Sequence, residues 1–147
     1  MSSLTSHVEV TLKSPRPGDF NELSAGDGDD RVEIDGRNNS LSGDSGKDVL
    51  VASGSFSTLV GGPDADALEV FGNDNVVSGS QGNDRIRTFG DSNRVDGGDD
   101  ADVAVALGSF NTLRGDSGDD VLKVTLRRPR VARRDRESAT SIRESSS

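Results

Sequence analysis

An 18-residue period runs through the chain from about Ala25 to Val124 and aligns without a gap. The repeat units begin at Ala25, Gly43, Gly61, Gly79, Gly97 and Gly115, and the last unit is truncated. We refer to the positions within a unit as columns 1 to 18. Regular repetition on this scale is typical of solenoids, in which each unit buries its apolar side only against its neighbours. The period therefore predicts a stack of coils.

Three columns carry the apolar residues of the repeat. Column 8 reads Val32, Leu50, Leu68, Ile86, Ala104 and Leu122, and column 17 reads Leu41, Leu59, Val77, Val95 and Leu113. Column 10 shares strand parity with column 8 and holds Ile34, Ala52, Val70, Ala106 and Val124, with Thr88 as the polar exception. Because columns 8 and 17 lie nine residues apart, each turn offers two short strands across a thin core. We expect an all-β parallel β-helix, or β-roll, solenoid with 18 residues per turn and about six turns.

Two further columns indicate bends. Column 12 is Gly in every complete unit, and column 15 is Asn or Ser: Asn39, Ser57, Asn75, Asn93 and Asn111. Since like strands of a parallel stack lie ~4.8 Å apart, every column becomes a row. A row of Asn side chains can form a ladder of amides that satisfies backbone groups of the bends. We interpret column 15 as structural.

Column 6 is the most regular polar feature of the chain. It holds Asp in all six units: Asp30, Asp48, Asp66, Asp84, Asp102 and Asp120. At ~4.8 Å, neighbouring carboxylates repel by roughly 1 kcal/mol in water and roughly 3 to 4 kcal/mol at an effective dielectric of 20. A cation between adjacent bends would reverse the sign of this energy, and Ca²⁺ prefers carboxylate and carbonyl oxygens. The row therefore predicts bound calcium.

The first half of each unit resembles the RTX (repeat-in-toxin) nonapeptide G-G-x-G-x-D-x-U-x, a calcium-binding parallel β-helix repeat. The segments GDSGKDVLV, GSQGNDRIR and GDSGDDVLK show it most clearly. The resemblance implies that the Asp side chain and carbonyls of the Gly-rich bend bind Ca²⁺ between successive coils. It places metal ligands at Asp30, Asp48, Asp66, Asp84, Asp102 and Asp120, with the matching bend glycines at Gly28, Gly46, Gly82 and Gly118.

The chain departs from that pattern in two ways. Asp64 and Asp100 replace the Gly at the fourth position, and the second half of each unit reads x-x-G-x-x-N-x-U-x. This implies calcium along one edge only, with the Asn row on the other. An Asp in a bend can also cap backbone amides, and a β-helix can carry acidic bends without metal. Six aligned copies favour the metal.

The composition indicates that a large hydrophobic core cannot be what stabilises the fold. Only 30% of the residues are hydrophobic, and Trp, Tyr and Cys are absent, which is close to the composition of disordered chains. Residues 1–126 carry 10 basic and 23 acidic groups. The repeats should repel one another without cations and do not suit nucleic acid. We expect folding to be coupled to Ca²⁺ binding.

The termini differ from the repeats. We expect residues 1–24 to form an N-terminal cap and first half-turn, because Val8, Val10 and Leu12 alternate like a strand and Gly18, Asn21 and Leu23 fall in columns 12, 15 and 17. The β-roll would cover 25–126. Residues 127–147 hold seven Arg against three acids and are predicted to be a disordered basic tail that could bind anions or the acidic repeats.

No stretch of the sequence is apolar enough to span a membrane, and the N-terminal residues lack the layout of a secretory signal peptide. The RTX resemblance implies a secreted, extracellular protein exported by a signal-independent route.

Two other function classes remain beside the calcium-binding module. One is a metal-independent β-helical binding or effector protein. It would use the basic tail or an apolar strip in column 11, formed by Phe71, Phe89 and Leu107, which lies outside the stack unless the corner buries it. The other is a polysaccharide-processing enzyme. It is disfavoured because His7 is the only histidine and no loop insertion makes room for a cleft. We predict a non-enzymatic protein.

Overall fold

The computed structural model describes residues 9–13, for which only the backbone is considered, and residues 20–126. Within these ranges the chain forms thirteen β-strands and no helix. Consequently this part of the chain contains no helix long and apolar enough to cross a membrane. The predicted cap residue Val8, the column-12 residue Gly18, the lone histidine His7 and the basic tail 127–147 lie outside the described residues.

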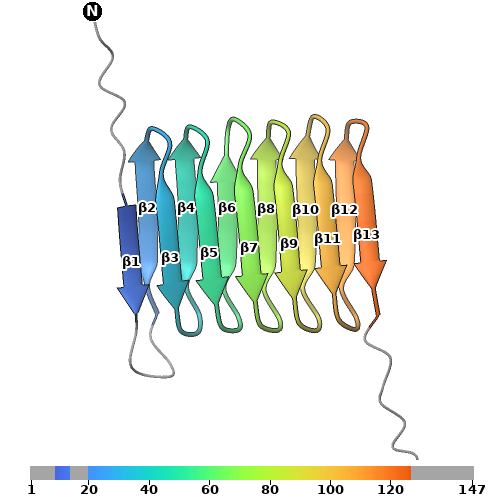
Figure 1. Cartoon of the computed structure of the whole chain (residues 1–147), viewed down its shortest axis with the longest axis horizontal. Coiled ribbons are helices and arrows are strands. Elements are labelled where there is room, and N and C mark those ends of the chain that lie inside the picture. The colour runs from blue at the N-terminus through green and yellow to red at the C-terminus, as the bar shows by residue number, and fades with distance from the viewer. Residues whose placement is uncertain (1–8, 14–19, 127–147) are drawn as a thin grey trace, which may run out of the picture.

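The strands alternate between two parallel sheets that face each other, and the stack runs from the N-terminal to the C-terminal end as a rod (Figure 1). Sheet 1 contains β1 (Glu9–Lys13), β3 (Arg31–Asp35), β5 (Val49–Ser53), β7 (Ala67–Phe71), β9 (Arg85–Phe89), β11 (Val103–Leu107) and β13 (Val121–Thr125). Sheet 2 contains β2 (Glu22–Asp27), β4 (Ser40–Ser45), β6 (Thr58–Gly62), β8 (Val76–Gln81), β10 (Arg94–Asp99) and β12 (Thr112–Ser117). The predicted parallel β-solenoid of about six turns is confirmed.

The register of both sheets follows the 18-residue period. In sheet 1, Leu50 pairs with Leu68 of the next strand, and in sheet 2, Leu59 pairs with Val77. Each residue therefore stacks on the residue of the same column one turn away. The turns are residues 25–42, 43–60, 61–78, 79–96, 97–114 and 115–126, called turns 1 to 6.

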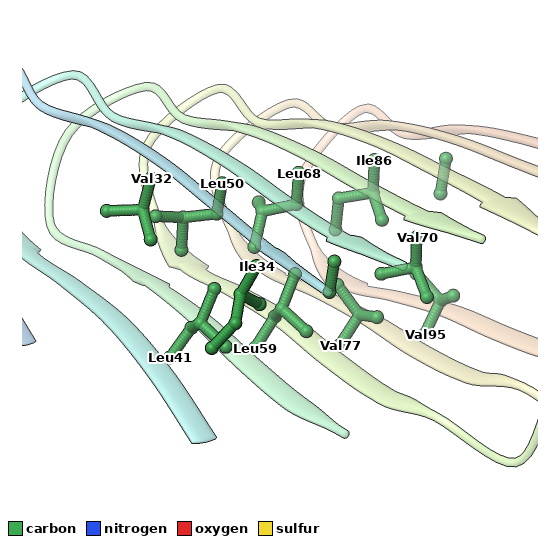
Figure 2. Packing of buried hydrophobic residues seen from close by; sticks show 12 residues of the cluster. Val32, Ile34, Leu41, Leu50, Leu59, Leu68, Val70, Val77, Ile86 and Val95 are labelled. Atoms are coloured by element: carbon green, nitrogen blue, oxygen red, sulfur yellow. The ribbon is translucent and has the colours of Figure 1, made fainter. Parts of the chain in front are cut away.

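The core is the thin layer between the two sheets. Figure 2 shows column 8 of sheet 1 as one row of side chains facing the column-17 row of sheet 2, with Ile34 and Val70 of column 10 beside them. The fully buried apolar residues are Val32, Ile34, Leu41, Leu50, Ala52, Leu59, Leu68, Val70, Val77, Ile86, Val95, Ala104 and Ala106. Thr88 is buried in the same layer. The predicted core columns are confirmed for the inner turns.

The two ends differ from the interior. At the N-terminal end, β1 continues sheet 1 with Val10 opposite Val32 and Leu12 opposite Ile34, as the predicted first strand requires. At the C-terminal end, Leu122 and Val124 occupy core columns yet are 43% and 46% exposed. The prediction that these residues are buried is wrong because β13 is the last strand of the described stack and has no neighbouring turn to cover it.

Column 11 lies at the end of each sheet-1 strand and faces outward. Phe71 is 42% exposed and Leu107 is 38% exposed, while Phe89 is partly buried between their turns. The Phe71 and Phe89 rings stack with centroids 4.9 Å apart and an interplanar angle of 7°. Of the two interpretations of this column, the outward apolar strip is therefore correct.

Candidate metal site: the aspartate edge

The column-6 aspartates lie at the bends that lead from sheet 2 into sheet 1, which we call the aspartate edge. Each Asp precedes the first residue of a sheet-1 strand, as Asp48 precedes β5 and Asp66 precedes β7. The strand pairing fixes successive column-6 residues one above another, so the row predicted from the sequence exists. Asp30, Asp48, Asp66, Asp84 and Asp102 are buried, and Asp120 in the last turn is partly exposed.

One carboxylate oxygen of each column-6 Asp from Asp48 to Asp120 has a structural task. Oδ1 of Asp66 accepts a hydrogen bond of 2.8 Å from the backbone N–H of Asp48 in the preceding turn. The same bond links Asp30 to Asp48, Asp66 to Asp84, Asp84 to Asp102 and Asp102 to Asp120, over 2.8–2.9 Å. These charge-assisted bonds satisfy backbone donors of the bends. They explain how the row is held in line, and they use only half of each carboxylate.

The second carboxylate oxygen has no hydrogen-bond donor in the inner turns. Oδ2 of Asp48, Asp66, Asp84 and Asp102 is buried without a hydrogen-bond partner. Each of these oxygens fills the space beside the column-1 glycine of its own turn. A Cβ on Gly79, for example, would lie closer than 3.0 Å to Oδ2 of Asp84. An anionic oxygen kept from water without a donor is costly unless a proton or a cation neutralises it.

Backbone carbonyls point into the same spaces. The carbonyl oxygen of Gly97 in turn 5 also lies closer than 3.0 Å to the Cβ position of Gly79 in turn 4. A carboxylate oxygen of one turn and a carbonyl oxygen of the next therefore converge beside each column-1 glycine from turn 2 to turn 5. Two oxygens side by side, of which the carboxylate oxygen has no donor, fit a hard cation such as Ca²⁺.

Carboxylates alone do not surround any point of the row. Within residues 9–13 and 20–126 no three His, Cys, Asp or Glu side chains gather as a metal cluster. This follows from the geometry, because each turn contributes one column-6 Asp at the strand-to-strand spacing. An ion in such a space would take the rest of its ligands from bend carbonyls.

The electrostatics of the row show the same cost. Burial, with a smaller effect of neighbouring carboxylates, raises the pKa of Asp48 to about 6 and the pKa of Asp66 and Asp84 to about 7. Burial also raises the pKa of Asp102. Hydrogen bonds from the backbone N–H of the preceding Asp act in the opposite direction and are too weak to cancel the burial. Without an ion, the row therefore makes ionisation of these carboxyls less favourable than it is for an exposed Asp.

The predicted bend glycines lie at the same edge but not at the same point. Gly28, Gly46, Gly82 and Gly118 have φ values between 104° and 148°, which only glycine adopts readily. They form the tip of the bend. Sequence reasoning missed the column-1 glycines Gly43, Gly61, Gly79, Gly97 and Gly115, which leave room for Oδ2. Their signal was a Gly five positions before each Asp from turn 2 on.

The opposite bends, which lead from sheet 1 into sheet 2, form the asparagine edge. There Oδ1 of Asn93 accepts the backbone N–H of Asn75 over 3.0 Å, while its Nδ2 donates to the carbonyl of Gly72 over 3.0 Å. Nδ2 of Asn75 and Nδ2 of Asn111 make the same bond to Gly54 and Gly90. The predicted amide ladder is confirmed.

Comparison with known families agrees with this geometry. The chain matches the RTX calcium-binding nonapeptide repeat in four copies, over residues 42–69, 71–104 and 96–123. These ranges cover more than half of the chain, which therefore belongs to this family. Searches of curated proteins and of solved structures gave no significant match. Membership of the family implies calcium binding.

Proposed function

We propose that this chain is a calcium-dependent structural module that binds Ca²⁺ in the spaces between successive bends of the aspartate edge and folds as it does so. The ligands are the column-6 aspartates Asp30, Asp48, Asp66, Asp84, Asp102 and Asp120, together with carbonyls of the glycine-rich bends that contain Gly28, Gly46, Gly82 and Gly118. The proposed role includes no catalytic step.

One observation carries the proposal. In turns 2 to 5 the buried Oδ2 of the column-6 Asp has no hydrogen-bond partner and lies beside a glycine carbonyl of the next turn. At the asparagine edge a side-chain N–H fills the corresponding need. A positive ion is the group that satisfies two oxygens at once, and the family to which the chain belongs is described as calcium-binding.

Folding would be coupled to the ion because the row is unfavourable without it. The carboxylates repel one another along the edge, and the core that opposes this repulsion consists of small and medium aliphatic residues. Ions that bind only the folded stack add their binding free energy to the free energy of folding. The unfolded chain has no preformed row to bind them.

We place the folded protein outside the cell. Extracellular calcium modules bind the ion at roughly 10⁻⁴–10⁻³ M, whereas a chain that needs such concentrations stays unfolded where calcium is scarce. An unfolded, self-repelling chain suits export by a route that does not require a folded cargo. Family membership supports this location.

Far-UV circular dichroism of the full chain tests the proposal. In chelator at pH 8, where the carboxylates are charged, the spectrum should be mainly that of a disordered chain, and added Ca²⁺ at roughly millimolar concentration should produce a β spectrum. Mg²⁺ is the control, because it requires near-octahedral geometry and keeps its waters. A β spectrum already complete in chelator and unchanged by Ca²⁺ would contradict the proposal.

The exposed Phe71–Phe89 stack with Leu107 favours a second candidate, a metal-independent binding protein that uses this strip. The calcium titration above separates the two candidates, and the Phe71→Ser and Phe89→Ser variants test what the strip contributes to folding. These should leave calcium-driven folding unchanged if the strip is a docking surface alone. Loss of calcium-driven folding would show that the strip is part of the folding unit.

A further inference from the structure

The bends of the aspartate edge are of two kinds that alternate from turn to turn. Columns 2 and 4 both have left-handed φ angles, and from turn 2 onward one of them is glycine and the other is not. The non-glycine residues are Asp44 in column 2, Asp64 in column 4, Ser80 in column 2, Asp100 in column 4 and Asp116 in column 2, with φ between 64° and 91°. From turn 2 onward, the same pattern of glycine and non-glycine in the bend therefore returns every second turn.

Close approaches between turns explain the alternation. Gly62 and Gly98, in column 2, face the carbonyls of Asp44 and Ser80 one turn earlier. A Cβ at either glycine would lie closer than 3.0 Å to backbone oxygen.

Those contacts lie between turns 2 and 3 and between turns 4 and 5. Between turns 3 and 4 and between turns 5 and 6, the close contact between glycine and carbonyl is in column 4 instead. There Gly82 and Gly118 face the carbonyls of Asp64 and Asp100. The spaces between turns 2 and 3 and between turns 4 and 5 therefore differ in shape from those between turns 3 and 4 and between turns 5 and 6.

The two kinds of space also differ in charge. Asp64 and Asp100 belong to turns 3 and 5, and Oδ2 of Asp100 accepts a hydrogen bond of 3.2 Å from the backbone N–H of Gly82 in turn 4. The Asp100 carboxylate thus reaches across the space between turns 4 and 5. It lies close enough to raise the pKa of both Asp84 and Asp102.

The column-2 acid has a different environment. The Asp44 carboxylate accepts a hydrogen bond of 2.7 Å from the Ser42 hydroxyl and another from the Ser24 hydroxyl, both on sheet 2. Its hydrogen bonds therefore direct it to the outer face of that sheet. Its charge nevertheless acts on the neighbouring column-6 acid, because it raises the pKa of Asp48. Of the column-4 acids, Asp100 makes the bond across an inter-turn space, and we assign Asp64 the same role because it occupies the same column, two turns earlier.

We propose that the aspartate edge holds two alternating classes of calcium site, and that the spaces carrying Asp64 and Asp100 bind Ca²⁺ more tightly than the other two. This rests on the proposed function and adds an order of filling to it. The buried Oδ2 atoms of Asp48 and Asp84, which have no donor, mark the ion positions in these two spaces. Asp64 and Asp100 replace the glycine at the fourth position of the family's bend, whereas Asp44, Ser80 and Asp116 replace the one at the second position.

Alternate filling has an electrostatic reason. Ions in neighbouring spaces would lie ~4.8 Å apart, whereas ions in alternate spaces lie about 10 Å apart. Since Coulomb repulsion falls with distance, the first ions repel one another about half as strongly in alternate spaces. If the two acidic spaces, which are separated by a less acidic one, bind Ca²⁺ first, the stack can fold before every space holds an ion.

Isothermal titration calorimetry of the full chain with Ca²⁺ tests the inference, using an Asp64→Asn/Asp100→Asn double variant. Asn tolerates left-handed φ and keeps an acceptor for the Gly82 N–H, so the change removes mainly charge. The matched control is Asp74→Asn, because Asp74 has φ 58° and lies in column 14 of the asparagine edge. Circular dichroism at saturating Ca²⁺ establishes that each variant folds, and the single Asp100→Asn variant replaces the double variant if that one does not.

The wild-type chain should show two classes of site, and the double variant should weaken the tighter class about tenfold, since ligand charge tunes calcium affinity. Asp74→Asn should match the wild type. A double variant with wild-type affinities, or an equal loss in Asp74→Asn, would overturn the alternation while calcium-dependent folding still stands. Absence of any calcium binding by the wild-type chain would instead remove the proposed function itself.

Discussion

At the asparagine edge, Nδ2 of Asn93 donates to the carbonyl of Gly72, whereas at the aspartate edge Oδ2 of Asp84 lies beside the carbonyl of Gly97 with no donor available. Oδ1 has the same role at both edges. In Asn93 and in Asp84 it accepts a hydrogen bond from a backbone N–H of the preceding turn. A nitrogen in place of an oxygen therefore supplies a donor at Asn75, Asn93 and Asn111. The aspartate edge has no such donor in turns 2 to 5, while Nδ2 of Asn39 in turn 1 is the unpaired exception at the asparagine edge.

The comparison explains why one fold carries two kinds of bend. The amide ladder gives stability that does not depend on protons or cations, because the amides of Asn75, Asn93 and Asn111 both donate and accept within the stack. Under the proposed function the carboxylate ladder makes stability conditional, because Oδ2 of Asp48, Asp66, Asp84 and Asp102 is buried without a hydrogen-bond partner. A stack with amides at both edges would fold without calcium, and one with carboxylates at both edges would be more acidic than this chain already is.

The largest expected effect is a reversal of the pH dependence by calcium. The folded-state pKa of Asp48 is raised to about 6 and those of Asp66 and Asp84 to about 7, above an ordinary value of 3.8. In chelator the fold should therefore be most stable near and below pH 4 and should lose stability as pH rises through 6 to 7.

With Ca²⁺ present the slope should be opposite over the same window, because protons compete with the ion for the carboxylates. Thermal unfolding followed by circular dichroism at pH 5 and pH 8, with and without chelator, measures both slopes. Equal slopes in the two conditions would show that the row of aspartates does not control folding.

A second prediction converts part of the asparagine edge. Asn93→Asp replaces a donor to the Gly72 carbonyl by an anionic oxygen, which should destabilise the calcium-bound fold by about 3 kcal/mol at neutral pH. Urea unfolding measures the change. Asn73→Asp is the control, because Asn73 is exposed and only accepts from Asp91 N–H, which a carboxylate can also do. A cost equal to that of the control would mean that the amide donor is unimportant.

A third prediction replaces an Asp of the aspartate edge by Asn, and the sign of its effect on the free energy of unfolding should depend on calcium. Asp84→Asn removes a buried charge, so in chelator it should stabilise the fold. With calcium it should cost about 2 kcal/mol, because binding free energy from adjacent spaces is lost. Asp99→Asn is the control for net charge, because it also removes one negative charge but at an exposed residue of the same edge. Thermal unfolding in both conditions is the measurement, and the same sign in both would count against a calcium ligand at Asp84.

The smallest expected effect concerns a buried oxygen that calcium does not reach. Oγ1 of Thr88 lies in the core without a hydrogen-bond partner. Thr88→Val keeps the shape and removes the unsatisfied hydroxyl, so it should stabilise the fold by about 1 kcal/mol. The gain should be the same at limiting and at saturating Ca²⁺, as measured by urea unfolding. A gain that varied with calcium would show that the core and the aspartate edge are not independent.

The sequence was sufficient to predict the features that repeat in every unit. The 18-residue period fixed the stack, the inward columns, the Asn ladder at Asn75 and Asn93, and the row of aspartates, because in a parallel stack a column becomes a row. The exposure of Leu122 was not foreseen, because a period says nothing of where the covering turn stops.

Features that depend on backbone direction were also not foreseen. The role of Gly79 follows from where the Asp84 carboxylate points, and the alternation of Asp64 with Gly82 follows from which carbonyl rises toward the next turn. Residue types in a column do not reveal carbonyl orientation. The metal ligands among the column-6 aspartates remain a prediction.

The most direct measurement is an anomalous-difference map from crystals of the full chain grown with Ca²⁺. The account predicts density in line along the aspartate edge, in the spaces beside Gly43, Gly61, Gly79 and Gly97, and none along the asparagine edge. An ordered stack with no density at the aspartate edge in the presence of the ion, or with equal density at both edges, would contradict it.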